Sequence, residues 1–393
     1  MRRPKVLVTG ATGKTGSAVV EQLRQRDWPV RALVHKQDAR SERLARLGAE
    51  VVVGDMHDPD QLLDAMRGVQ RAYYLTLFQP YMVQAATAFA VAARAARLEA
   101  IVQLSQWLSH RSHPSILTRE TWLVDNMFSM IPGVAHIIVN PGMFADNFLR
   151  VLDFASLLYF YPVFAGDSKS APVANEDIAR VACALLMDPE RHGGQRYRPT
   201  GPVLLSGRDM AAVIARVVGH PVKAISLPFW IFSKAARMTG AGIHEVYNYR
   251  EYLRDHRQGA FSFDGGVNDV VAQLTGQAAE DFETTARRYA AMPFARQTFA
   301  NRLKAFARFN ILPVYPGHDL AAYERQMRFP RPPRPSLASS DERWLAEHGA
   351  GAGVATPGQP ETGRVEGRAE PTARAAMALA TTAASGRTAG DLR

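Results

Sequence analysis

The amino-acid sequence predicts an α/β protein: a doubly wound parallel sheet, a smaller, mostly helical C-terminal region and a disordered tail. Three observations lead to this prediction. Short apolar segments alternate with helical patterns between residues 5 and 147, which is typical of parallel β-α-β units. From residue 150 to 330 the alternation weakens and helical patterns dominate. After residue 349 the chain is rich in Ala, Gly, Thr, Pro and Arg without periodic apolar residues, as disordered segments are.

The same pattern divides the chain into three stretches. We expect residues 1–150 to form the sheet domain and residues 151–330 a smaller region that completes the fold. Residues 331–393 are expected to be a proline-rich connector and a largely disordered tail. Strands are predicted over residues 6–8, 30–34, 51–53, 72–75, 101–104 and 135–139, and helices over 17–26, 43–47, 61–66, 84–96, 209–218 and 279–291.

Composition excludes several classes of protein. Apolar residues make up 47% of the 393-residue chain, but no run approaches the roughly 20 apolar residues of a membrane span. We therefore expect a cytoplasmic protein without a membrane span. The single cysteine, Cys183, excludes internal disulfides and lies in an apolar run that predicts burial, and the eleven histidines show no metal-ligand spacing. The net charge of +10 comes mostly from scattered arginines, which argues against nucleic-acid binding.

A glycine-rich segment lies between the first predicted strand and an amphipathic helix. It reads Thr9-Gly10-Ala11-Thr12-Gly13-Lys14-Thr15-Gly16. In a dinucleotide-binding loop of this spacing, Gly10 permits a tight turn, Gly13 lets the backbone approach a pyrophosphate, and Gly16 lets the helix pack closely on the strand. The first N–H groups of the helix would face the phosphates. The residues predicted to bind the cofactor here are Gly10, Thr12, Gly13, Lys14, Thr15 and Gly16.

The sequence favours this interpretation over two others. One alternative is a glycine-rich turn with a purely structural role. The other is a P-loop, which needs four residues between its first glycine and the Gly-Lys pair, whereas two separate Gly10 from Gly13. Residues 1–150 are therefore predicted to be an NAD(P)-binding Rossmann domain.

The end of the second predicted strand bears on which dinucleotide binds. NAD sites usually have an acidic residue there, which holds the ribose 2′-hydroxyl. This strand is followed by His35 and Lys36, and Asp38 lies beyond the expected position. Lys36, helped by Arg40, could pair with a 2′-phosphate. We therefore favour NADP(H) over NAD(H), the alternative being that His35 and Lys36 belong to an ordinary solvated loop.

Several segments resemble the NmrA-like family of atypical short-chain dehydrogenases/reductases. They are the glycine loop, the second strand Val30-Arg31-Ala32-Leu33-Val34, Gly54-Asp55, Asn140-Pro141-Gly142-Met143-Phe144-Ala145-Asp146-Asn147, and Leu274-Thr275-Gly276 followed by Phe282. The resemblance covers residues 5–291 and implies an NADP(H)-binding Rossmann domain with a small helical substrate domain. It also implies that Asp55 and Met56 border the adenine, and that Thr76 and Ser105 border the ribose and nicotinamide side.

The sequence departs from the usual short-chain dehydrogenase pattern at the catalytic position. These enzymes use a serine and a Tyr-x-x-x-Lys pair, whose phenol passes a proton to the substrate. Ser105 stands near the serine position, but no tyrosine lies between Tyr81 and Tyr159 and no lysine between Lys36 and Lys169. The proton relay is therefore missing, and no catalytic residue is assigned. Asn140 also replaces the arginine that is usual in the family.

Residues after the sixth strand are expected to border the substrate, since ligands lie beyond the carboxyl ends of the strands. They are Phe144, Asn147 and Phe148. The aromatic run at residues 229–232 could line an apolar acceptor, but an apolar helix face packed into the core is favoured.

Two hypotheses of different class follow. The leading one is an NADPH-dependent oxidoreductase that acts on a small apolar carbonyl or quinone-like acceptor. The alternative is a catalytically silent NADP(H) sensor that binds a protein partner. An epimerase or isomerase is disfavoured because it too usually needs Tyr-x-x-x-Lys. The sequence does not indicate the substrate or the oligomeric state.

Overall fold

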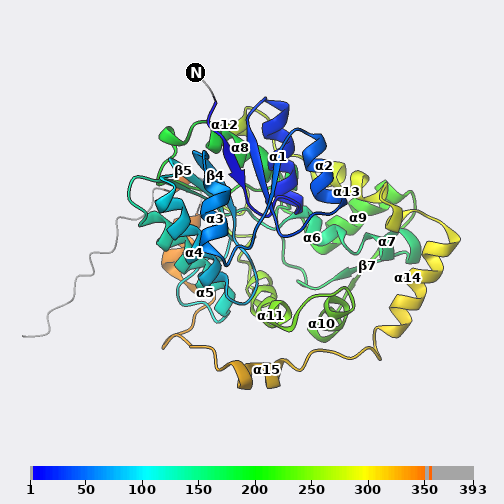
Figure 1. Cartoon of the computed structure of the whole chain (residues 1–393). Coiled ribbons are helices and arrows are strands. Elements are labelled where there is room, and N and C mark those ends of the chain that lie inside the picture. Colours follow the sequence, from blue (N-terminus) through cyan, green and yellow to red (C-terminus); the bar gives the residue numbers. More distant parts are fainter. Residues whose placement is uncertain (1–2, 350–353, 356–393) are drawn as a thin grey trace, which may run out of the picture. The chain divides into compact units, whose positions relative to one another are not determined.

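The computed structural model describes residues 3–349 and 354–355 (Figure 1). Most of the predicted disordered tail, residues 350–353 and 356–393, lies outside the described residues. The description below concerns the compact unit that ends at Thr356.

The central sheet has the strand order β10-β8-β6-β5-β4-β1-β2-β3, and all its strands are parallel except β10. The strand order reverses between β1 and β4, because the chain passes from β1 outward to β2 and β3 and then returns to the other side of β1. This confirms the doubly wound, Rossmann-type prediction. The six predicted strands are β1 to β6. The bounds are β1 (Val6–Val8), β2 (Val30–Val34), β3 (Glu50–Val53), β4 (Arg71–Leu75), β5 (Ala100–Leu104), β6 (Ala135–Val139), β8 (Arg196–Tyr197) and β10 (Val354–Ala355).

Alternate side chains of strands β1 to β5 enter two separate cores, one on each face of the sheet. Val6 and Val8 of β1 belong to the first core, whereas Leu7 between them belongs to the second. This alternation follows from the two-residue period of a strand. Helices α1 (Lys14–Gln25), α2 (Ala39–Arg46), α8 (Asn175–Met187) and α12 (Val270–Thr275) cover the first core, and α3 (Pro59–Met66), α4 (Met82–Ala95) and α5 (Ile116–Ser129) cover the second.

Side-chain caps set where several helices begin. Asp38 accepts hydrogen bonds from the backbone N–H groups of Arg40 and Ser41, so α2 begins at Ala39 rather than at the predicted residue 43. Asp58 caps α3 in the same way, with Pro59 as the first helical residue. Both starts were missed because the apolar periodicity begins one turn later than the cap.

A third core holds the smaller region together. It joins α6 (Ala145–Leu149), α7 (Leu152–Leu158), α9 (Gly207–Val218) and α13 (Phe282–Ala290) to a separate two-stranded parallel sheet of β7 (Phe160–Val163) and β9 (Lys223–Ser226). Helices α10 (Phe229–Met238) and α11 (Ile243–Arg257) follow β9. No helix in the described ranges is both long and apolar enough to cross a bilayer.

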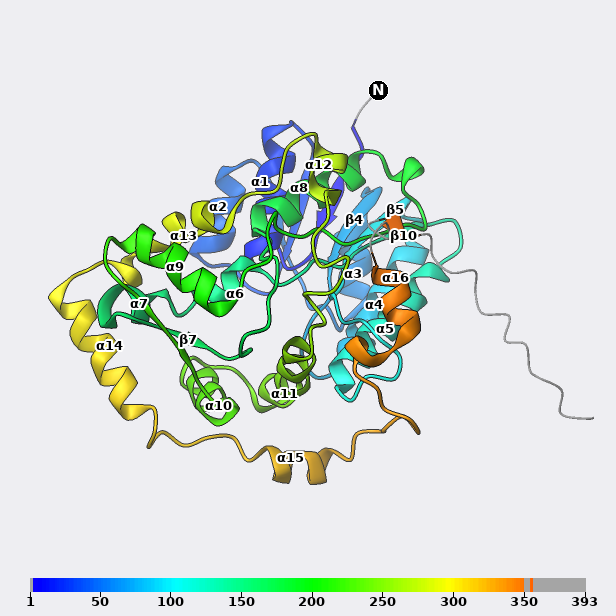
Figure 2. The ribbon, with the colours of Figure 1, turned by 180° about the vertical axis from the view of Figure 1, so that it is seen from behind.

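The last described segments contact the sheet domain again (Figure 2). After α14 (Phe299–Ile311) and α15 (Leu320–Met327), the chain reaches α16 (Glu342–His348). Trp344 of α16 packs in a fourth apolar cluster with Trp107, which follows β5, and the imidazole of His348 contacts the Trp107 carbonyl at 3.2 Å.

Buried Asp255 accepts the Ala338 N–H at 2.8 Å and contacts His113 Nε2 at 3.2 Å. Short 3₁₀ helices occur at Pro189–Arg191, Pro293–Ala295 and Ala338–Ser340.

Cys183 lies in the first core and is fully buried, as predicted. Burial raises the pKa of its thiol to about 12. The thiol is therefore neutral at physiological pH and serves as a small apolar side chain.

The buried imidazole of His136 predicts a loss of stability in mild acid. His136 lies 5% exposed in β6, with its Nε2 2.9 Å from Gln103 Oε1. Burial, reinforced by the charge of Arg196, lowers its pKa to about 3. Between these two pKa values the unfolded chain, with a histidine pKa of about 6.5, binds a proton at His136 and the folded chain does not. The stability that depends on neutral His136 is therefore fully present above about pH 6.5 and is lost as the pH falls below that value.

We expect His136 alone to lower the free energy of unfolding by about 2 kcal/mol between pH 7 and pH 5. Urea unfolding of the wild type and of His136→Gln at both pH values measures this, because the variant should lose less stability over the same interval. An equal loss in the two proteins would contradict the assignment. His220→Gln is the control, since His220 is not buried.

Candidate functional site

The three glycines of the loop differ in what surrounds them. Gly10 has a φ of +58°, and a Cβ there would lie 2.3 Å from Leu75 Cδ2. A Cβ on Gly16 would lie 2.3 Å from the Gly10 carbonyl oxygen. Neither position can accept a side chain without displacement of backbone or core. A Cβ on Gly13, in contrast, would meet only the Gly10 oxygen, at 3.1 Å. Gly13 is therefore the one of the three glycines whose backbone is least covered by neighbouring atoms.

Helix α1 begins directly after this bare backbone. Gly13 is its N-cap residue and has no side chain to satisfy the N–H groups of the first turn. The Gly13 N–H donates to the Gly10 carbonyl at 2.9 Å and closes the loop. Free N–H groups and the positive end of the helix dipole favour an anion at this place. The loop also lies where the strand order reverses, which is where ligands bind in doubly wound sheets.

The other predicted site residues follow the carboxyl ends of neighbouring strands. Thr76 and Ser105 are buried directly after β4 and β5, and the Ser105 hydroxyl has no hydrogen-bond partner among the described residues. Asp55 follows β3 and is exposed. Hydrogen bonds from the backbone and ring of His57, and the charge of His35, hold the pKa of Asp55 below its usual value. Met56 follows and packs against the second core.

At the end of β2, His35 and Lys36 are exposed, and Lys36 makes no ion pair with any residue that the structure describes. The nearest following carboxylate, Asp38, caps α2 and contacts Arg40 Nη2 at 2.6 Å. The Arg40 hydrogen bond is the main reason why the pKa of Asp38 is lowered. Asp38 is therefore already engaged, and Lys36 is the free charge at this position.

Helix α5, where the proton relay would lie, carries a structural network instead. Asp125 of α5 accepts hydrogen bonds from Gln103 Nε2 at 2.8 Å, Ser109 Oγ at 2.8 Å and Arg196 Nη1 at 3.0 Å. The same Arg196 donates to Asn140 Oδ1 at 2.9 Å. Asn140 is thus buried against an arginine from β8. The sequence alone did not show this partner, because β8 is only two residues long.

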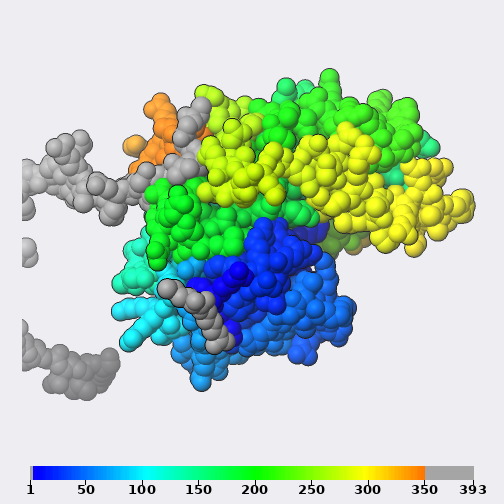
Figure 3. All heavy atoms as spheres, turned by 90° about the horizontal axis from the view of Figure 1, so that it is seen from above, coloured from blue at the N-terminus to red at the C-terminus, as the bar shows by residue number. Residues whose placement is uncertain are grey.

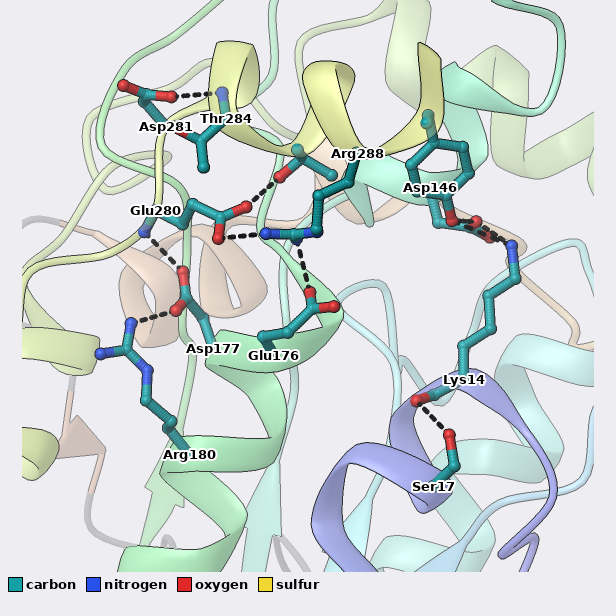
Figure 4. Close-up of polar contacts among 12 residues, drawn as sticks. Lys14, Ser17, Asp146, Glu176, Asp177, Arg180, Glu280, Asp281, Thr284 and Arg288 are labelled. Atoms are coloured by element: carbon teal, nitrogen blue, oxygen red, sulfur yellow. Dashed lines mark hydrogen bonds and ion pairs between the residues drawn. The ribbon is translucent and has the colours of Figure 1, made fainter. Parts of the chain in front are cut away.

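A second group of residues reaches the glycine loop from the smaller region (Figure 4). Lys14 donates through Nζ to the carboxylate of Asp146 in α6 and to the hydroxyl of Tyr289 in α13, the latter at 3.0 Å. The Tyr289 hydroxyl also donates to Asp146, and Arg150 Nε contacts the other carboxylate oxygen at 3.1 Å. Burial would raise the pKa of Asp146, but the Lys14 and Tyr289 hydrogen bonds and the charge of Arg150 keep it below its usual value.

Sequence reasoning missed the roles of Asp146 and Tyr289. Asp146 stands inside the segment that carries the family resemblance, which was a usable signal. Tyr289 is 143 residues further along the chain, and no local pattern connects the two.

Further polar contacts in Figure 4 connect α8 to α13 and to the segment before it. Asp177 accepts the Glu280 N–H at 2.7 Å, and Arg288 bridges Glu176 at 2.8 Å and Glu280 at 2.6 Å. These contacts hold α13, and with it Tyr289, against α8, which covers the first core of the central sheet.

The predicted substrate residues lie after β6 in different environments. Phe144 is half-buried against the first core, Phe148 packs between the third and fourth clusters, and Asn147 is exposed. The expected packing of the apolar helix face at residues 229–232 into the core is wrong in part: only Ile231 and Ser233 of α10 are buried, and Trp230 is 52% exposed. This helix packs mainly against α11, which leaves much of its surface to solvent.

Comparison with known proteins agrees with this architecture. The model of the NmrA-like family matches residues 2–122. The chain is 30% identical over 292 residues to an NAD(P)H azoreductase of Xenophilus azovorans, covering 73% of this chain and 98% of that one. It therefore belongs to the NmrA-like family. It is also 28% identical over 277 residues to (4-alkanoyl-5-oxo-2,5-dihydrofuran-3-yl)methyl phosphate reductase of Streptomyces griseus, covering 70% of this chain and 95% of that one.

Two solved structures share the fold. One is an NADPH-dependent quinone oxidoreductase of Escherichia coli in complex with NADPH, with a TM-score of 0.62 and 21% identity over 72% of this chain and 99% of that one. The other is NmrA, a negative transcriptional regulator, in complex with NAD, with a TM-score of 0.61 and 17% identity over 73% of this chain and 95% of that one.

The buried carboxylate of Asp146 gives a testable consequence. Asp146→Asn should lower the free energy of unfolding at pH 7 by about 1–2 kcal/mol, less than a fully buried pair because the Lys14 side chain is 54% exposed. The folded-state pKa of Asp146 lies below the unfolded value of about 3.9. Its contribution is therefore present above that pH and disappears as the pH falls through the folded-state value.

Urea unfolding at pH 7 and at successively lower pH values below about 4 measures the difference between wild type and variant, which should shrink as the pH falls. The matched control is Asp167→Asn, whose carboxylate is 87% exposed and 3.6 Å from Arg208. A similar loss in both variants would contradict a stabilising role for Asp146.

Proposed function

We propose that the protein binds NADP(H) and transfers hydride from NADPH to a small apolar carbonyl or quinone-like acceptor without a Tyr-x-x-x-Lys relay. The observation that carries this proposal is the bare Gly13 backbone at the start of α1, at the switch point of the sheet. The NAD(P)H azoreductase and the (4-alkanoyl-5-oxo-2,5-dihydrofuran-3-yl)methyl phosphate reductase align over nearly their whole lengths, and their names support a reductase. A cytoplasmic location is part of the proposal.

The residues present fit a dinucleotide that runs along the carboxyl edge of the sheet. The pyrophosphate would lie on the backbone from Gly10 to Gly16, beside Thr12, Lys14 and Thr15. The adenosine half would lie near Asp55 and Met56. Thr76 and Ser105 would border the nicotinamide ribose, and the buried, unpartnered hydroxyl of Ser105 supports a polar ligand there.

NADP(H) is proposed over NAD(H) because of charge at the end of β2. An acidic residue at this position would repel a 2′-phosphate, whereas Lys36 is exposed and His35 lies beside it. Arg40 could assist only by leaving Asp38, so Lys36 is the main determinant.

In the proposed hydride transfer, the main task of the protein is to hold the acceptor against the nicotinamide. Bound NADPH supplies the hydride. Phe144, Asn147 and Phe148 are proposed to hold the acceptor at the nicotinamide end of the site, which raises the rate by orientation. α5 offers no phenol-lysine pair, so the proton that completes reduction comes from solvent. An acceptor that spreads negative charge over a conjugated system tolerates this better than a simple ketone does.

A specific observation supports a second candidate, a catalytically silent NADP(H) sensor that binds a protein partner. Helix α5 carries no Tyr-x-x-x-Lys pair, and its Asp125 is paired with three side chains and holds the fold. Turnover separates the two candidates, since the sensor binds NADPH without oxidising it.

Calorimetric titration with NADPH, NADP⁺ and NADH, followed by NADPH oxidation assays with a quinone and an azo dye, tests the proposal. Gly13→Val should weaken NADPH binding by about a hundredfold and abolish oxidation, because the side chain covers the N–H groups that contact phosphate. Gly242→Val is the matched control, since Gly242 has an ordinary φ of −71° and no atom within 4 Å of an added Cβ. NADPH binding without turnover would favour the sensor, and no nucleotide binding would refute both.

Lys36→Glu tests the choice of cofactor. Losing the cation and adding a repulsive carboxylate should weaken NADPH binding by roughly tenfold to a hundredfold. NADH binding should stay the same or improve, because the new carboxylate can accept the ribose 2′-hydroxyl. Lys223→Glu, an exposed lysine of β9, should change neither. If the wild type binds NADH as tightly as NADPH, the 2′-phosphate argument is wrong although the dinucleotide site stands.

A further inference from the structure

Helix α14 is exposed over most of its surface. Of its 13 residues only Ala305 is buried. Its inner side packs on the smaller region: Phe309 contacts Phe160 with 5.1 Å between ring centroids, and Arg308 pairs with Asp153 at 2.8 Å. Figure 1 shows the helix beside α7 at the edge of the described unit, and Figure 3 shows the yellow segment that includes it at the rim of that view.

The outer side of α14 is an apolar row. Phe299 is 84% exposed, Leu303 58% and Phe306 57%. These residues are spaced by four and then three positions, so they share one face of the helix. We call this row the outer face. Three large apolar side chains this exposed on one short helix are more than scattered surface residues, and such patches usually mark an interaction site.

The charged residues of α14 and of the segment just before it are all cationic. Arg302 and Lys304 lie on either side of the row, at positions adjacent to Leu303. From residue 291 to 318 the chain has four arginines or lysines and no aspartate or glutamate. The only acidic contact of these cations among the described residues is that of Arg308 with Asp153, on the inner side.

The apolar character continues past the end of the helix. Val314 is 80% exposed. Lys234 of α10 donates to the Pro313 carbonyl at 2.5 Å and lies 5.2 Å from the ring centre of Trp230, which is 52% exposed. A half-exposed tryptophan beside a lysine is typical of side chains at the boundary between lipid and water.

We propose that the outer face of α14 docks on the surface of an anionic lipid bilayer. A helix with Phe and Leu on one face and flanking Lys and Arg lies in the interface of a membrane, with its apolar side chains among the acyl chains and its cations among the headgroups. The net charge of +10 adds a long-range attraction to a negative surface. This is peripheral docking and needs no spanning helix.

The charges favour lipid over a second copy of the chain. In a symmetric dimer the same patch meets itself, so the cations around α14 would face their own copies with no carboxylate from residues 291–318 to pair with. A row of three side chains is also small beside the roughly 800 Å² per partner of a standard protein interface. An anionic bilayer supplies both the apolar medium and the negative charge.

The test is co-sedimentation of the full-length protein with vesicles of phosphatidylcholine alone or mixed with phosphatidylglycerol. We expect binding to the mixed vesicles that weakens with added salt, and little binding to phosphatidylcholine. Phe299→Ser with Phe306→Ser should reduce partitioning at least about tenfold. Arg302→Gln with Lys304→Gln should reduce it about tenfold on the mixed vesicles only.

The matched control is Leu123→Ser with Met130→Ser, two exposed apolar residues of the α5 region, at 49% and 71% exposure. It should bind like the wild type, and thermal unfolding checks that every variant is folded. Absence of binding to mixed vesicles at low salt, or equal binding by the Phe variant, would overturn the proposal. So would a wild-type dimer that the Phe variant dissociates, or a cross-link from residues 356–393 to α14 in lipid-free protein. None of these measurements depends on nucleotide binding or turnover, so the proposed function can fail separately.

Discussion

The contact between the backbone at Gly10 and the start of α1 at Gly16 is the constraint on which the rest of the structure depends. Helix and loop approach so closely that a single methyl group on Gly16 would lie 2.3 Å from a carbonyl oxygen. This closeness holds the N-terminus of α1 at the carboxyl end of β1. It also lets Val19, Val20 and Leu23 enter the first core with the strands. The packing of α1 and the exposure of its first N–H groups therefore have one cause.

Much of the sheet domain could be predicted from the sequence, because its signals are local. The strands β1 to β6 are short apolar runs, and the glycine loop lies between an alternating and a helical pattern. Helix starts were less accurate, since Asp38 and Asp58 cap their helices a turn before the apolar pattern begins. The predicted loop residues and strand-end residues all lie at one edge of the sheet, because the strands that carry them are parallel.

The smaller region and its contacts could not be predicted in the same way. The pairing of β7 with β9 joins segments about 60 residues apart in sequence, and two short strands carry little pattern of their own. Asp125 finds Arg196 on a strand of two residues. Trp344 and His348 return to Trp107 from a segment whose composition indicated a connector. Each of these contacts depends on how distant segments meet, and propensity and periodicity do not contain that information.

The hydrogen bond between Lys14 and Asp146 makes the glycine loop and the smaller region thermodynamically linked. Lys14 stands at the first turn of α1, and its ammonium group is shared with a carboxylate and a phenol from α6 and α13. An anion that accepts a hydrogen bond from the Lys14 ammonium group would weaken the bond of that group to Asp146. Such coupling is reciprocal, so the bond to Asp146 would weaken anion binding as well. A change that strengthens the bond between Lys14 and Asp146 would then weaken anion binding at the loop by the coupling free energy between the two contacts. In this structure the ammonium group of Lys14 is already engaged by Asp146 and Tyr289, so an anion at the loop must compete with these two side chains for it.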